Sequence, residues 1–140
     1  MVGVDDRDGG PAGPRGRIGR SGEDAAARYL AGQGWRIIGR NIRVDRDELD
    51  IVALDAARPT QLVIVEVRAS SRGGFGHPLE SVDARKVARL YRAASRLTRS
   101  GGVATPDHRI DGWRVDLVTL SRSGARDWTV TAHLRGLEPP

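Results

Sequence analysis

Two carboxylates lie inside apolar runs of the kind that form β-strands. Asp50 stands between Leu49 and the run 51–54, and Glu66 ends the run 62–65. A buried carboxylate is costly unless it is hydrogen-bonded, ion-paired or bound to a metal. Carboxylate oxygens suit Mg²⁺ or Mn²⁺, and because magnesium keeps several waters, two protein carboxylates are sufficient. Asp50 and Glu66 therefore predict a divalent-metal site.

A metal in this position would suit phosphodiester hydrolysis, because it polarises a phosphate and lowers the pKa of an attacking water. Arg68, two residues after Glu66, would stabilise the negative charge that develops on the phosphorus oxygens. Purely structural alternatives remain. Asp50 could be solvated near a strand end or paired with Arg43, and Glu66 could pair with Arg68 or Arg114.

A second charged pattern lies in the helix expected at residues 83–100, with Asp83 as its N-cap. Its five arginines, spaced four, three, four and three residues apart, fall in one stripe roughly 80° wide. They have no acid among them, so an anionic partner would relieve their repulsion, although a plain solvated face is the alternative. Backbone contacts by such a stripe are not sequence-specific. The candidate nucleic-acid contacts are Arg72, Arg85, Lys86, Arg89, Arg92 and Arg96.

The elements expected to position these residues form an α/β layer. Residues 1–17 are rich in Gly, Pro, Asp and Arg and predict a disordered tail, and residues 18–135 predict a single domain. A helix should begin at Ser21 and end at Gly32 to Gly34. Three strands joined by short turns follow as an antiparallel meander, at 35–44 (one strand or two short ones), 48–54 and 61–68. After the helix at 83–100, two more strands are expected at 113–120 and 128–134.

Strand alternation then decides which side chains meet. Asp50 shares a face of its strand with Glu48 and Val52, and Glu66 shares one with Ile64 and Arg68. If these two strands pair through the turn at 55–60, Asp50 and Glu66 lie on the same face of the sheet.

Composition favours a polyanionic partner. The 140 residues carry a net charge of +5, with a pI of about 10.8, which points most simply to nucleic acid. No apolar run of about 18 residues predicts a membrane span, and the N-terminus lacks the pattern of a signal peptide. The absence of cysteine excludes disulfides and fits a cytoplasmic location.

Four segments also resemble a known family. Over about residues 18–120 their order and spacing are those of the YraN-like proteins, small bacterial proteins of unassigned function with a restriction-endonuclease-like fold. The segments are Gly22-Glu23-Asp24-Ala25-Ala26, Glu48-Leu49-Asp50-Ile51-Val52-Ala53, Val65-Glu66-Val67-Arg68 and Gly76-His77-Pro78-Leu79-Glu80-Ser81-Val82. The resemblance implies an α/β fold with a central mixed β-sheet flanked by helices.

The resemblance also implies site residues. The wider superfamily uses Asp followed by (Asp or Glu)-x-Lys, and Asp50 and Glu66 match the metal-binding acids. Glu23 matches an additional acid on a helix, although the helix dipole alone favours an acid in a first turn. Arg68 departs from the pattern, because arginine stays protonated and cannot act as a general base where the family has lysine. Lys86, the only lysine of the chain, either supplies the missing ammonium or is a surface residue.

Two function hypotheses follow. The first is a nuclease-like protein that uses Mg²⁺ or Mn²⁺ on DNA, branched or damaged DNA included, with Glu23, Asp50, Glu66 and Arg68 in the catalytic site. The alternative is a catalytically impaired nucleic-acid-binding module, in which Arg68 neutralises Glu66. A weaker third hypothesis is a protein-interaction subunit that docks on an acidic partner.

Overall fold

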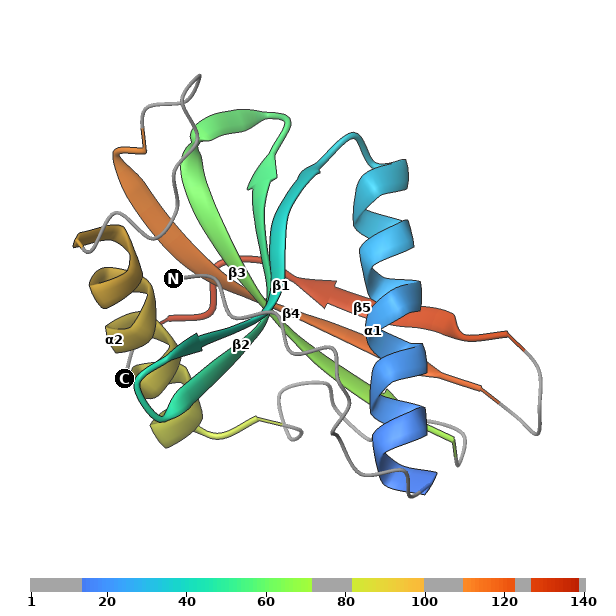
Figure 1. Ribbon diagram of the computed structural model, residues 1–140. Coiled ribbons are helices and arrows are strands. Elements are labelled where there is room, and N and C mark those ends of the chain that lie inside the picture. The colour runs from blue at the N-terminus through green and yellow to red at the C-terminus, as the bar shows by residue number, and fades with distance from the viewer. Residues whose placement is uncertain (1–13, 72–81, 100–109, 123–126, 139–140) are drawn as a thin grey trace.

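A five-stranded sheet lies between two helices (Figure 1). The computed structural model describes residues 14–71, 82–99, 110–122 and 127–138. The elements in chain order are α1 (Pro14–Gly32), β1 (Arg36–Val44), β2 (Asp47–Asp55), β3 (Arg58–Ser70), α2 (Ala84–Arg99), β4 (Gly112–Ser121) and β5 (Thr129–Leu134). The predicted α/β class, with a central mixed sheet flanked by helices, is confirmed, and the arrangement is consistent with a restriction-endonuclease-like core.

The strands lie in the sheet in chain order, β1-β2-β3-β4-β5. β1, β2 and β3 form the predicted antiparallel meander. β4 then pairs with β3 in parallel, which requires a crossover, and α2 lies in that connection. β5 returns antiparallel to β4 and makes the sheet mixed.

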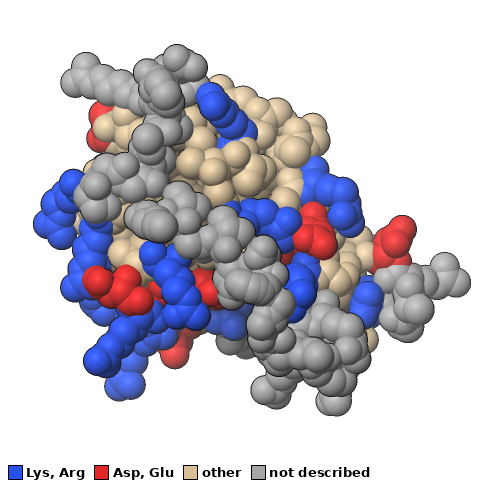
Figure 2. Space-filling model, viewed as in Figure 1, with Lys and Arg blue, Asp and Glu red and all other residues tan. Residues whose placement is uncertain are grey.

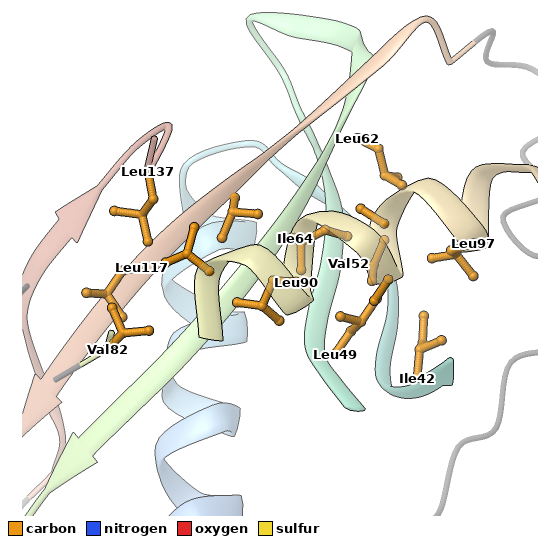
Figure 3. Packing of buried hydrophobic residues seen from close by; sticks show 14 of the residues in the cluster. Ile42, Leu49, Val52, Leu62, Ile64, Val82, Leu90, Leu97, Leu117 and Leu137 are labelled. Atoms are coloured by element: carbon orange, nitrogen blue, oxygen red, sulfur yellow. The ribbon is translucent and has the colours of Figure 1, made fainter. Parts of the chain in front are cut away.

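Each face of the sheet has its own apolar core. Val52 and Ile64 pack with Leu90 of α2 on one face, as Figure 3 shows, and Ile51 packs with Leu30 of α1 on the other. Even-numbered positions of β2 and β3 therefore face α2 in this part of the sheet. No helix in the described ranges is long and apolar enough to cross a membrane.

The first helix begins earlier than predicted. It starts at Pro14, so Ser21 lies inside α1 and is not its N-cap. Proline is tolerated in a first helical turn because its missing N–H would have no partner there. The Ser21 hydroxyl instead accepts a hydrogen bond of 2.7 Å from Nε1 of Trp128. Residues 14–17 are thus helical rather than part of a disordered tail, and residues 1–13 lie outside the described ranges.

The other boundaries follow the predictions more closely. β3 begins at Arg58, not at residue 61, because the turn after β2 is shorter than expected. Pro59 is accommodated because the ladder to β4 starts only at Gln61, so its missing N–H interrupts no pairing with β4. The predicted N-cap of α2 is confirmed: Oδ1 of Asp83 accepts a hydrogen bond of 2.9 Å from the backbone N–H of Lys86.

Candidate functional site

Asp50 and Glu66 come together where the ladder between β2 and β3 ends. The last paired residues in this direction are Ile51 and Val65, and Asp50 and Glu66 are the adjoining residues of the two strands. Oδ2 of Asp50 accepts a hydrogen bond of 2.9 Å from the backbone N–H of Val67. The Asp50 carboxylate therefore accepts a hydrogen bond from the backbone of β3 at the point where strand pairing stops, and this bond holds its side chain against β3.

The electrostatics of Asp50 reflect this crowding. Burial raises the pKa of Asp50 well above its ordinary value, and the neighbouring carboxylates of Glu66 and Glu23 raise it further. The hydrogen bond from Val67 and the charge of Lys86 act in the opposite direction but do not cancel these effects. Burial and the neighbouring acids therefore favour the protonated form of Asp50 in the free protein.

Glu66 is the most buried acid of the group, with a side chain 4% exposed. Its Oε2 lies 3.1 Å from Nη2 of Arg68 and 4.0 Å from Nζ of Lys86. Its Oε1 is buried without a hydrogen-bond partner among the described residues. A buried carboxylate oxygen without a partner is unusual, and it favours a bound cation or water that completes the site.

Arg68 and Lys86 bring two positive charges to the same carboxylate from different elements. Arg68 lies on β3, and Lys86 lies in the first turn of α2, with side chains 37% and 29% exposed. Lys86 therefore lies beside the carboxylates rather than on a detached surface. Of the structural alternatives for Glu66, the pair with Arg68 is present, whereas Arg114 pairs with Asp55 and Asp116.

Glu23 reaches this region from α1. It lies well inside the helix, so the attraction of a first-turn acid to the helix dipole does not explain it. Gly22 positions it: a Cβ built on Gly22 would meet Cβ of Ala69 at 2.6 Å, so α1 and β3 approach as closely as glycine allows. Oε1 of Glu23 lies 3.7 Å from Nη2 of Arg40 and has no hydrogen-bond partner among the described residues.

Burial raises the pKa of Glu23 from 4.5 to about 7. Arg40 and Asn41 act against this shift, and the carboxylates of Glu48 and Asp24 add to it. Sequence reasoning missed Arg40, which also binds Asp24 at 2.7 Å. Its position in a polar stretch of β1 provides no signal that it contacts α1.

The acidic side chains of this region suit a hydrated divalent cation better than a fully enclosed one. Within the described residues, no three Asp, Glu or His side chains lie close enough together to enclose a metal ion. Asp50 and Glu66 nevertheless suit a hydrated magnesium, which takes one or two carboxylates and keeps its other ligands as water. The unpartnered Oε1 of Glu66 supports this fit. Glu23 lies close enough to influence Asp50 electrostatically but does not complete a three-residue ligand set.

The arginine stripe of α2 is exposed along its length, but it is partly neutralised. Arg96 forms an ion pair with Asp45, and Nε of Arg89 lies 3.8 Å from Oδ1 of Asp47. The other members form no ion pair within the described residues; they are Arg85, Arg92 and Arg99. The remaining predicted contact in this group, Arg72, lies outside the described residues, as does His77.

A second buried polar cluster, on the α1 side of the sheet, is structural. Asp116 is fully buried and accepts hydrogen bonds of 2.9 Å from Nε of Arg114 and from the backbone N–H of Gly136. Nε2 of His133 lies 2.9 Å from its other oxygen, and Tyr29 contacts Nδ1 of His133 at 3.0 Å. Burial acts to raise the pKa of Asp116, but the hydrogen bonds from His133 and Arg114 outweigh it and lower that pKa. This cluster joins α1, β4 and β5, and it explains why an aspartate stands in an apolar strand.

Comparison with known proteins places the chain in a family. A family model described as "Uncharacterised protein family UPF0102" matches residues 22–120, a range that contains Glu23, Asp50, Glu66 and Lys86. The chain belongs to the UPF0102 family. The YraN-like proteins are this same family, so the resemblance inferred from the four sequence segments is confirmed.

Relatives in the UPF0102 family match nearly full length. A UPF0102 protein of Arthrobacter sp. strain FB24 is 43% identical over 120 residues, which cover 86% of this chain and 94% of the relative. One of Paenarthrobacter aurescens is 46% identical, with 86% and 92% covered. One of Streptomyces coelicolor is 41% identical over 126 residues, with 88% and 89% covered.

Proposed function

We propose that this UPF0102 protein is a metal-dependent nuclease-like enzyme that acts on DNA. The observation that supports it best is the buried carboxylate pair, Asp50 and Glu66, which leaves one carboxylate oxygen without a partner. The high pI and the exposed arginines of α2 support a polyanionic substrate. We also propose a cytoplasmic location, which the absence of cysteine favours.

In this proposal Asp50 and Glu66 hold Mg²⁺ or Mn²⁺. Such an ion supplies Lewis-acid polarisation of a phosphate and a lowered pKa for a bound water. The protein supplies the remaining charge stabilisation: Arg68 and Lys86, which flank Oε2 of Glu66, bind the phosphate oxygens and offset their negative charge. Arg68 suits this role because its guanidinium is always charged and donates two parallel hydrogen bonds to an oxyanion.

Glu23 assists from α1. Its carboxylate contributes negative potential at Asp50 and keeps the region attractive to a cation. The close packing of Gly22 on Ala69 places the neighbouring Glu23 near β3. Glu23 therefore acts as a positioning and electrostatic residue in this proposal.

One observation favours a second candidate, a nucleic-acid-binding module without catalysis. Arg68 already forms an ion pair with Glu66 at 3.1 Å, and a permanent cation there competes with a metal for the same oxygen. Arginine also cannot accept a proton from water. In this case the carboxylates would be neutralised by Arg68 and Lys86, and binding would depend on the arginines of α2.

The two candidates are separated by measuring binding of Mg²⁺ and Mn²⁺ by calorimetry and cleavage of linear and branched DNA. The variants are Asp50→Asn, Glu66→Gln and Arg68→Lys, with Asp111→Asn as a matched control, because Asp111 is an exposed acid whose backbone N–H donates a hydrogen bond to Thr60 at the other end of β3. If the protein is a metal-dependent enzyme, the first two variants should lose metal binding and cleavage, and the control should keep both. Inactive wild type with activity in Arg68→Lys supports the second candidate. Unchanged cleavage by Asp50→Asn would contradict the site.

A further inference from the structure

We propose that the turn between β1 and β2 competes with nucleic acid for the arginines of α2. The acidic turn, Asp45 and Asp47, forms ion pairs with Arg96 and Arg89 in the free protein. A phosphodiester backbone would displace these carboxylates when it binds. This inference rests on the proposed nucleic-acid binding and adds an intramolecular control of it.

The acidic turn is held in place by its backbone. Val44 pairs with Asp47 across the hairpin, so only Asp45 and Arg46 form the loop. Asp45 has a φ of 56°, a left-handed conformation that aspartate tolerates better than most residues. The hairpin thus presents its two carboxylates to α2 from a defined position rather than from a long flexible loop.

The ion pairs divide the stripe of α2 into two lines along the helix. Arg89 and Arg96 form the paired line, and they lie on the side of the stripe that faces the acidic turn. The open line, at the other edge of the stripe, has no ion pair within the described residues and consists of Arg85, Arg92 and Arg99. Residues seven apart on a helix are separated by about 10.5 Å along its axis. The open line therefore offers a backbone three cations over about 21 Å.

The paired line begins close to the carboxylate site. Arg89 follows Lys86 by three residues, about one helical turn, and Lys86 lies 4.0 Å from Glu66. Figure 2 shows basic side chains gathered on the α2 side of the molecule, with acidic side chains among them. A backbone that followed the whole stripe toward the site would therefore meet the acidic turn on its way.

The ion pairs are suited to exchange. The Arg96 and Asp45 side chains are 50% and 63% exposed, and those of Arg89 and Asp47 are 47% and 26% exposed. An exposed ion pair is worth at most about 1 kcal/mol, which corresponds to about a fivefold change in an equilibrium constant. Nucleic acid also releases condensed counterions when its phosphates are neutralised, an advantage that a side-chain carboxylate lacks. DNA should therefore displace the acidic turn at low salt.

The test uses Asp45→Asn, Asp47→Asn and the double variant, with DNA affinity measured by fluorescence anisotropy at several salt concentrations. Asp127→Asn is the matched control, because it makes the same charge change before β5, where the adjoining Trp128 packs on the α1 side of the sheet. Each single variant should tighten binding by up to about fivefold relative to the control. The slope of log K against log salt should stay close to the wild-type value, because the same arginines neutralise phosphates in both complexes once the turn is displaced. Heparin affinity chromatography gives a second readout, in which the double variant should elute at higher salt than the control.

The outcomes separate this inference from the proposed function. Suppose that wild type binds DNA and that the double variant Arg85→Gln/Arg92→Gln binds it more weakly. If the acidic-turn variants then have the same DNA affinity as Asp127→Asn, only the competition is refuted. A purely structural role of the turn would lower the stability of the variants without tightening their binding to DNA, which also refutes the competition. If neither wild type nor any variant binds DNA or heparin, the nucleic-acid function and the inference both fail.

Discussion

Glu23→Gln should stabilise the protein at neutral pH and leave its stability in mild acid almost unchanged. Burial raises the pKa of Glu23 from 4.5 to about 7, and its side chain is only 16% exposed. Between these two pH values the folded state holds a proton that the unfolded chain has released, so the free energy of unfolding falls as pH rises. At 1.36 kcal/mol per pKa unit, the loss by pH 8 is about 3 kcal/mol. This loss is a large part of the free energy of unfolding of a typical domain, which is about 5–15 kcal/mol.

Glutamine cannot ionise, so the substitution removes this loss. The pKa of Asp50 should also fall, because Glu23 is one of the charges that raise it. We therefore expect Glu23→Gln to exceed wild type by about 3 kcal/mol at pH 8 and to match it near pH 4.5.

The assay is urea unfolding followed by tryptophan fluorescence from pH 4.5 to 8, with a chelator present to remove divalent cations. Trp35, 6% exposed, reports loss of the core. Glu138→Gln is the control, because it neutralises an exposed carboxylate near the C-terminus. A wild type that gains stability between pH 5 and 7, or a Glu23→Gln variant with the same pH dependence as wild type, would refute the reasoning.

Three further predictions concern packing and the second polar cluster. Gly22→Ala should destabilise the protein by about 1–3 kcal/mol in denaturant unfolding, since its Cβ would meet Ala69 at 2.6 Å; adding Ala69→Gly should restore part of the loss, and no recovery would contradict the clash. Asp116→Asn should lower the free energy of unfolding by about 3–5 kcal/mol at pH 7, because it leaves the Arg114 guanidinium poorly paired. The pKa of Asp116 is lowered in the folded protein, so its contribution to wild-type stability should disappear as the pH falls from 3.8 through that lowered pKa. An equal difference in stability between variant and wild type at pH 7 and at pH 2 would contradict this explanation. Leu90→Ala, at a residue 1% exposed on α2, should cost about 2–5 kcal/mol by creating a cavity, and a loss below 1 kcal/mol would contradict tight packing of α2 on the sheet.

The limits of prediction from sequence are visible in the two helices. For α2, the periodic arginines, the apolar face and Asp83 as N-cap predicted the helix almost to the residue, because these signals are local. For α1, the glycine and proline content before Ser21 predicted no helix, yet the structure is helical from Pro14. The intrinsic helix propensity of the residues predicts a helix only weakly, and contacts with the rest of the chain can override it.

The carboxylate site likewise has a part that local sequence signals predicted and a part that they did not. The apolar runs around Asp50 and Glu66 predicted the strands β2 and β3, but Leu49 and Ile51 pack on opposite faces of the sheet, so the strict alternation that the prediction used does not hold at Asp50. The two acids come close because the ladder between β2 and β3 ends beside them. That Glu23 contributes to the same region depends on the close approach of α1 to β3 at Gly22. No pattern within either element specifies that approach.

The chain's sequence alone thus determined the strands, the arginine stripe, the pair of acids and the family, because each depends on residue types at short, regular spacings. Only the tertiary structure decided that Lys86 lies beside Glu66, that Asp45 and Asp47 neutralise two arginines of α2, and that Asp116 is satisfied by Arg114 and His133. These contacts join elements far apart in the chain. Their distances depend on how each helix packs across the sheet, which short-range periodicity does not specify.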